Sequence, residues 1–384
     1  MVREVYKRYQ RPLARVVQGL STSWEVVVTS TCRQTFNGMA SWSPCNRFIA
    51  VATTGAVEIR DAVTLSILNI FESPSGSGPK LSFSPDSRFL TCFRKTDRVT
   101  WDLQTGGSIG VDTVLPKGLF LNSTTFSSAH STDGKMVAVV YPDEDFENPS
   151  HFIVTHDSST AHPHIYRVSE GCFISPIWTH GEFLRFATLE PGSITIREVD
   201  FTLTRTPEVV ESLPAPDEIA DAGRLKESLF LPTLSRLAMV FNHVLLLLDV
   251  RDSKILLKTR GPYSFGISFS SDGRFFACGD LDEVHVWKES PTGYVLHQKL
   301  AFFGYMGPFL SPNGESILIS LHSTIHLWHT KDPIFSGGPI SVSEKEDFFL
   351  EFSPHKTFAA FARSGENAVV LYCHDQPGIK ISRS

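Results

Sequence analysis

The densest group of side chains that could do chemistry is a run of histidines near the middle of the chain. His151, His156, His162 and His164 lie close together, and Asp157 is among them. Imidazole and carboxylate groups bind transition metals, but this spacing matches no known zinc motif. His156-Asp157 also stands where one copy of a repeat ends, which favours a structural role. The sequence therefore predicts no metal site and no cofactor.

Other signatures of catalysis are missing from the sequence. No HExxH, GxSxG, GxxxxGK[ST] or EF-hand pattern occurs. The glycine-rich residues 73–78 are not followed by Lys-Ser or Lys-Thr, so we interpret them as a loop between repeats. Two acidic runs, residues 141–149 and 207–221, are interpreted as solvated loops, with a lip for a basic partner as the alternative. These observations predict a protein that is not an enzyme.

Composition and charge exclude several other classes. The chain has 384 residues, of which 41% are hydrophobic and 29 are Phe, and this load of aromatic side chains suits stacked sheets. A net charge of -6 gives no indication of nucleic-acid binding. The sequence contains no signal peptide and no apolar run long enough to span a membrane. We expect a cytoplasmic location, with the nucleus as the alternative.

The six cysteines show no CxxC or other ligand spacing. Two of them, Cys92 and Cys278, occupy equivalent places in the second strand of two repeats, where a small buried side chain fits. We interpret all six as reduced thiols of an intracellular protein: Cys32, Cys45, Cys92, Cys172, Cys278 and Cys373.

A repeated pattern organises the chain, and its clearest copy spans residues 265–287. An alternating apolar strand ends in a Ser-Asp-Gly turn at residues 271–273, a second strand follows, and a short acidic loop leads to a third. Alternation predicts strands with one buried face, and Asp-Gly between them predicts a hairpin. The turns of eight copies begin at residues 43, 84, 131, 179, 231, 270, 311 and 353, at intervals of 39 to 52 residues.

A period near 40–45 residues with four strands per copy is typical of β-propellers. A single blade cannot bury both faces, so the blades must close into a ring. The eighth copy has only a short tail after its third strand, and the strand expected at residues 24–31 is the candidate for its missing outer strand. We therefore predict an all-β fold: a closed β-propeller of four-stranded antiparallel blades, eight rather than seven, closed by the N-terminal strand.

Three segments follow from this interpretation. Residues 1–23 form a basic N-terminal segment in which a short helix is expected, residues 24–375 form the propeller, and residues 376–384 form a C-terminal tail. Residues 1–16 carry five basic side chains and one acidic one. We interpret the basic segment as a solvated linker or docking helix, with a joint to a partner or an upstream domain as the alternative.

The turn, the second strand and the Trp-Asp ending resemble those of WD-repeat proteins. The resemblance covers residues 24–375 and is strongest at residues 84–102, 270–287 and 311–328. The Gly-His pair that opens a regular WD repeat is missing, so the hydrogen-bond network of that family cannot form in full, and we expect aromatic packing to replace it. Structural roles are assigned to Trp101, Asp102, Asp272, Gly273, Trp287 and Trp328.

A narrower resemblance concerns residues 14–24, ARVVQGLSTSW. This entry into degenerate WD repeats is similar to the C-terminal propellers of fungal NACHT-type signalling proteins, in which a nucleotide-binding region precedes the propeller. Because the chain has no GxxxxGK[ST], any such ATPase would lie outside it. Phosphoinositide-binding propellers carry an FRRG motif, and this sequence has none.

The predicted function is a non-catalytic scaffold or recognition module that binds a protein or peptide on the loop face of the propeller. Rigid blades with variable loops offer a preformed surface, which reduces the ordering cost of binding. In the WD-repeat family, partners commonly dock where loops join the second and third strands. By position, these loops hold Arg94, Lys95, Asp97, Glu190, Asn242, His243, Asp280, Asp282, Glu283, His322, Arg363 and Glu366. The alternatives are an enzyme or small-ligand sensor that uses the channel, and the sensor half of an NTPase signalling protein.

Overall fold

Small antiparallel sheets follow one another along the whole described chain. The computed structural model describes residues 25–31, 36–53, 55–73, 79–94, 97–109, 127–142, 151–157, 163–168, 173–174, 177–190, 192–215, 219, 225–263, 265–280, 283–301, 308–321, 324–330, 340–341, 348–352, 358–363 and 368–373. The predicted N-terminal helix and C-terminal tail lie outside these residues.

The described strands form eight sheets, which are numbered here in chain order. Sheet 1 contains β2 (Phe36–Trp42), β3 (Phe48–Thr53), β4 (Ala56–Asp61) and β5 (Ile67–Glu72). Sheet 2 contains β6 (Lys80–Phe83), β7 (Phe89–Arg94) and β8 (Asp97–Asp102). Sheet 3 contains β9 (Ser128–His130), β10 (Met136–Pro142), β11 (His151–Asp157) and β12 (His164–Val168). Sheet 4 contains β13 (Phe173–Ile174), β14 (Trp178–His180), β15 (Phe183–Glu190), β16 (Ser193–Asp200) and β17 (Glu208–Pro214).

The second half of the chain repeats this order. Sheet 5 contains β18 (Leu225–Leu231), β19 (Arg236–Phe241), β20 (Val244–Asp249) and β21 (Lys254–Arg260), with the 3-10 helix η1 (Pro232–Leu234) after β18. Sheet 6 contains β22 (Phe265–Phe269), β23 (Phe275–Gly279), β24 (Glu283–Ser290) and β25 (Gly293–Ala301). Sheet 7 contains β26 (Phe309–Leu310), β27 (Ser316–Leu321), β28 (Thr324–His329) and β29 (Ile340–Ser341). Sheet 8 contains β30 (Phe348–Phe352), β31 (Phe358–Arg363), β32 (Ala368–Cys373) and the N-terminal β1 (Glu25–Thr31).

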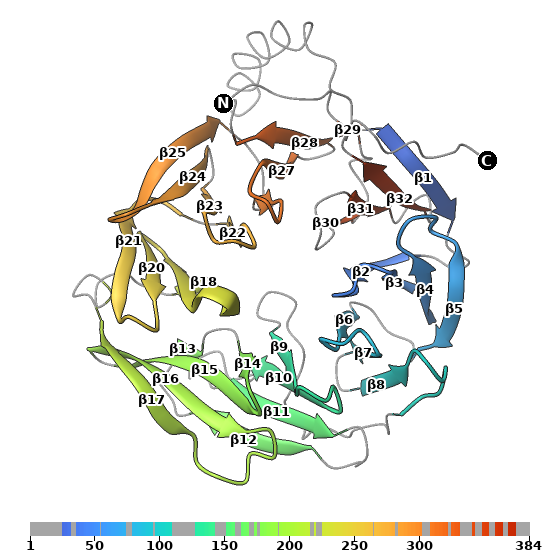
Figure 1. Cartoon of the computed structure of the whole chain (residues 1–384), viewed down its shortest axis with the longest axis horizontal. Helices are drawn as coiled ribbons and strands as arrows, with labels where there is room; N and C mark the ends of the chain where they lie inside the picture. Colours follow the sequence, from blue (N-terminus) through green and yellow to red (C-terminus); the bar gives the residue numbers. More distant parts are fainter. Residues whose placement is uncertain are drawn as a thin grey trace, which may run out of the picture.

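The sheets are arranged around a common centre, as in a β-propeller (Figure 1). The first strand of each sheet lies towards the centre and the last lies at the periphery. β1 pairs antiparallel with β32, from Glu25 opposite Cys373 to Thr31 opposite Ala368. This is the partner expected for it from the sequence, and the pairing brings distant parts of the chain into one sheet.

The core lies between neighbouring sheets. One buried cluster combines Ala50, Ile59 and Phe71 of sheet 1 with Leu90 and Trp101 of sheet 2. Each strand alternates its side chains between two faces, so each sheet can bury apolar side chains against both neighbours. Burial of a side chain the size of Leu90 stabilises the fold by about 2 kcal/mol. The expected aromatic packing is present, because the Phe71 and Trp101 rings stack across the two sheets at 5.2 Å.

The turn between the first and second strands is built in the same way in several sheets. In sheet 6, Ser270 Oγ donates to Asp272 Oδ1 at 2.7 Å and accepts from the backbone N–H of Phe275 at 2.9 Å. Gly273 has a φ of 65°, and a Cβ there would collide with Leu234 of sheet 5. Glycine therefore provides both the left-handed conformation and the close approach between the sheets.

The turn of sheet 1 differs from this arrangement at Cys45. Cys45 stands where the turns of sheets 2, 3, 6 and 7 have Asp or Asn, and its Sγ lies 3.4 Å from Ser43 Oγ. Although burial raises it, hydrogen bonds from Ser43, Ser87 and the Arg47 backbone leave the pKa of the Cys45 thiol lower than usual. The thiol thus lies where the hydrogen-bond donors of the turn would bind a carboxylate more strongly.

Replacing this thiol with a carboxylate is expected to stabilise the protein. Cys45→Asp should raise the free energy of unfolding by about 1 kcal/mol, because a carboxylate accepts the Ser43 and Arg47 hydrogens better than a thiol. Urea unfolding of Cys45→Asp and Cys45→Ala measures the difference. A Cys45→Asp protein no more stable than Cys45→Ala would show that the position is indifferent to its acceptor.

One predicted loop is wrong. Residues 207–221 were expected to be solvated, but Glu208–Pro214 forms β17 and pairs antiparallel with β16. Leu213 is buried, whereas Val209 and Val210 are exposed. A peripheral strand buries little of its surface, so its sequence can remain as acidic as that of a loop. The described part of the chain has no helix of the length and apolar character needed to cross a membrane.

Candidate functional site

The predicted partner-binding residues all belong to connections between second and third strands, which lie at one end of each sheet. We call this the loop end. Glu190 ends β15, Asn242 and His243 join β19 to β20, Asp280 follows β23, and Glu283 begins β24. Arg94 and Arg363 end β7 and β31, and Asp97 begins β8. Lys95, Asp282, His322 and Glu366 lie outside the described residues.

In sheet 6 the loop end gathers four charged or titratable groups. His285 Nε2 lies 2.9 Å from Glu283 Oε2 and 3.6 Å from Asp280 Oδ2. Lys299 Nζ lies 3.1 Å from the same Glu283 oxygen, and the Glu283 N–H donates to Asp280 Oδ1 at 2.7 Å. We call these residues the sheet 6 cluster. Sequence reasoning selected Asp280 and Glu283 but missed His285, although side chains two residues apart on a strand share a face.

Hydrogen bonds within this cluster act on the Glu283 carboxyl. The bond from His285, and then that from Lys299, lower the pKa of the Glu283 carboxyl. The ring of His285 lies edge-on to Tyr263 at 5.5 Å, which fixes its orientation. Asp280, Glu283 and His285 place one ligand atom each within 4.8 Å of the others, a spacing that could hold a metal ion. Because Glu283 Oε2 already accepts from His285 and Lys299, the arrangement is complete as a hydrogen-bonded cluster.

The loop end of sheet 4 is also internally paired. Arg197 Nη2 donates to Glu190 Oε1 at 2.6 Å, and Thr195 Oγ1 donates to the same oxygen at 3.1 Å. The hydrogen bond from Arg197 is the main reason that the pKa of Glu190 is lowered. Glu190 therefore stabilises its own sheet as well as facing the loop end.

The structure does not bring the histidine run together. His151 pairs with Val168, whereas His164 pairs with Thr155, so the two histidines lie towards opposite ends of the β11–β12 pair. His156 is buried beside Phe93, and His162 lies outside the described residues. Strand pairing thus separates groups that are close in sequence.

The residues assigned structural roles occupy the interior and the turns. Trp101, Trp287 and Trp328 are buried, and Asp272 and Gly273 form the turn of sheet 6. Asp102 Oδ1 accepts from the backbone N–H of Gln104 at 2.8 Å and so closes the turn that follows β8.

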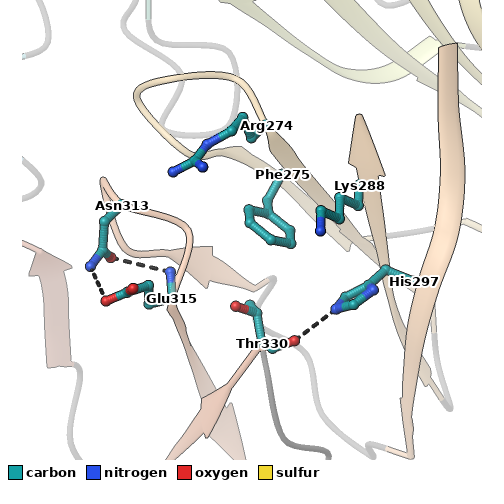
Figure 2. Close-up of a pocket in the computed structure, with 7 residues that line it drawn as sticks. All are labelled: Arg274, Phe275, Lys288, His297, Asn313, Glu315 and Thr330. Atoms are coloured by element: carbon teal, nitrogen blue, oxygen red, sulfur yellow. Dashed lines mark hydrogen bonds between the residues drawn. The ribbon is translucent and has the colours of Figure 1, made fainter. Parts of the chain in front are cut away.

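A pocket lies at the opposite end of the sheets, which we call the turn end. It has a volume of about 300 Å³ and lies between sheet 6 and sheet 7. Arg274, Phe275, Lys288 and His297 line it from sheet 6 (Figure 2). The prediction placed every binding residue at the loop end and missed this pocket. The sequence did contain one signal of this pocket. Lys288 follows Trp287, at the position where a Trp-Asp ending has aspartate.

Comparison with known proteins shows the fold. The β-propeller domain of Swd1 (Cps50) from Myceliophteria thermophila is similar with a TM-score of 0.51 and 16% identity, covering 91% of this chain and 99% of that chain. Sqt1 from Saccharomyces cerevisiae is similar with a TM-score of 0.57 and 10% identity, covering 91% of this chain and 98% of that chain. Both neighbours are WD40 β-propellers. No protein-family model matches the chain, and no curated protein sequence matches it.

Proposed function

We propose that this chain is a non-catalytic recognition module, a closed eight-bladed β-propeller that binds a protein or peptide at its loop end. The eight sheets and the pairing of β1 with β32 support the closed form. Each blade would then bury both faces, and the ring would have no open sheet edge around its circumference. We place this activity in the cytoplasm or nucleus.

The sheet 6 cluster carries the proposal. Asp280 and His285 are buried, and both are held next to Glu283 on the rigid ends of β23 and β24. Polar groups fixed in this way lose little freedom when a partner binds, so a larger share of the interaction energy appears as affinity. A cluster with carboxylate, imidazole and ammonium groups suits a partner with mixed polar side chains.

Affinity purification with a matched pair of triple variants tests this function. The loop-end variant carries Arg94→Glu, Glu283→Lys and Arg363→Glu, so that it alters the sheet 6 cluster. The turn-end control makes the same charge changes at exposed positions, with Lys135→Glu, Arg205→Glu and Asp252→Lys. A partner retained by the intact chain and by the control, but lost from the folded loop-end variant, is the expected result.

Two outcomes would contradict the proposal. Retention of the partner by the loop-end variant would move the site elsewhere on the propeller. Purified protein that carries stoichiometric metal or a small molecule, with no partner, would favour the enzyme or small-ligand sensor.

The narrower resemblance supports a specific setting for this module. The similarity of residues 14–24 to fungal NACHT-type proteins suggests a recognition half joined to an NTPase. Sequencing the transcript upstream of the codon for Met1 tests this setting, and a reading frame without a nucleotide-binding region would exclude it.

A further inference from the structure

One position at the turn end changes its charge around the propeller. In each sheet, the first residue of the second strand lies opposite one residue of the third strand. In sheets 1 to 5 this opposite residue is an aspartate. These residues are Asp61, Asp102, Asp157, Asp200 and Asp249. In sheet 6 the equivalent residue, opposite Phe275, is Lys288. A carboxylate is thus replaced by an ammonium group.

Sheet 2 shows what the carboxylate does. Arg88 Nη2 and Nε donate to Asp102 Oδ2 at 2.8 and 3.2 Å, while Asp102 Oδ1 accepts from the turn that follows. The carboxylate therefore closes the turn with one oxygen and binds the arginine of the preceding turn with the other. That arginine and Phe89, which follows it, correspond to Arg274 and Phe275 of sheet 6.

Sheet 6 keeps the arginine, Arg274, but has no aspartate at position 288 to accept from it. Arg274 Nε turns back to Asp272 Oδ2 at 2.6 Å, and no described residue accepts from its two terminal nitrogens. Lys288 makes no ion pair with a described residue, and its ammonium lies 5.9 Å from the centre of the Phe275 ring. Two cationic side chains thus stand where sheet 2 has an ion pair.

The hairpin of sheet 6 also extends past this position. β24 continues to Ser290 and β25 begins at Gly293, so Lys288 pairs with Val295 instead of closing a turn. On the side that faces sheet 7, His297 Nε2 of β25 donates to the Thr330 carbonyl at 2.8 Å.

The wall from sheet 7 is polar. Asn313, Glu315 and Thr330 form it, and Asn313 Nδ2 donates to Glu315 Oε2 at 2.7 Å (Figure 2). The pocket lining therefore has one carboxylate, held by a neighbour, against the two cations of the sheet 6 wall. Figure 2 shows these side chains around one open space, with the Phe275 ring between Arg274 and Lys288.

We propose that this pocket binds the carboxylate of an acidic side chain, Asp or Glu, in a peptide partner. The incoming carboxylate accepts from the terminal nitrogens of Arg274 and from the ammonium of Lys288, as Asp102 accepts from Arg88 in sheet 2, and its methylene groups contact the Phe275 ring. Planar guanidinium groups favour carboxylates, and charge-assisted bonds of this type are the stronger ones. The inference rests on the proposed function in that the ligand is a peptide, but the site lies at the opposite end of the sheets.

Fluorescence anisotropy with a blocked, labelled hexaglutamate peptide tests the site on the full chain at about 50 mM salt, where screening is weak. Lys288→Asp places a carboxylate of the protein itself beside Arg274, where it competes with the peptide. It should therefore weaken binding about tenfold or more, the effect of one charge-assisted contact. Arg274→Gln should weaken binding as well. Arg205→Asp makes the same charge change as Lys288→Asp at an exposed turn-end position, and it should bind as the unaltered chain does.

Stability and position act as internal controls. Lys288→Asp should melt at a temperature no lower than the unaltered chain, because it recreates the ion pair of sheet 2. The loop-end triple variant should bind hexaglutamate unchanged, so failure of the proposed function leaves this result intact. Binding that survives Lys288→Asp, or that is lost in the loop-end variant, would overturn the site. A hexaphosphoserine peptide that binds more than about tenfold tighter and is lost in Lys288→Asp would overturn the choice of carboxylate in favour of phosphate.

Discussion

Acidification from about pH 8 to about pH 5 is expected to remove about 4 kcal/mol from the free energy of unfolding. The source is a pair of buried histidines in sheet 3. Burial lowers the pKa of His130 to about 4, and burial together with Arg98 lowers that of His156 to about 3. The unfolded chain takes up both protons below its ordinary histidine pKa, near 6.5, whereas the folded chain does not. Stability is therefore fully present above that pH and is lost as the pH falls towards the folded values.

Urea unfolding across this pH range measures the effect, and two variants locate it. His156 is 1% exposed and neither ring nitrogen has a hydrogen-bond partner among the described residues, so His156→Leu removes no hydrogen bond that the structure shows. This variant should show about half the pH dependence. His243→Gln, which removes an exposed histidine, should leave the dependence unchanged. An identical slope in all three proteins would exclude the buried histidines as its source.

Trp101→Ala is expected to cost about 4 kcal/mol of stability, within the usual range for a buried aromatic side chain. The indole is 3% exposed and stacks on Phe71 of the neighbouring sheet, with an angle of 21° between the rings. Its removal leaves a cavity between sheets 1 and 2. The loss should appear as a lower melting temperature with partner binding retained below it.

The matched variant is Trp101→Phe, which keeps the stack and should cost about half as much. Thermal unfolding and partner capture are measured on the same preparations. Lost capture with an unchanged melting temperature would mean that Trp101 belongs to the binding site and not to the frame.

The second and third strands could be predicted from the sequence because their side chains alternate and a turn fixes where they begin. β23 was expected at residues 275–278 and is found at Phe275–Gly279. The pairing of β1 with β32 followed from counting strands, since a repeat that lacks its last strand needs one from elsewhere.

Peripheral strands and sites between sheets could not be predicted in this way. β17 has exposed Val209 and Val210, so its surroundings do not impose a clear alternation. His285 lies two residues after Glu283 on the same face of β24, but its approach to Asp280 depends on how the loop after β23 folds. Lys288 was visible as a departure from Trp-Asp, but its meaning depends on Arg274 and on the extended hairpin, which no linear pattern records.

The pairing of β1 with β32 also sets a condition on biosynthesis. On the ribosome, Glu25–Thr31 is translated early, and its partner Ala368–Cys373 emerges only after seven sheets have been made. Until then the edge of β1 is unpaired, and closure over so long a stretch of chain is slow. Nascent chains on one messenger RNA lie close together, and each exposes an unpaired β1 and, later, an unpaired edge of β32. Strong overexpression therefore favours exchange of β1 between chains, and slower synthesis favours pairing of β1 with β32 of the same chain.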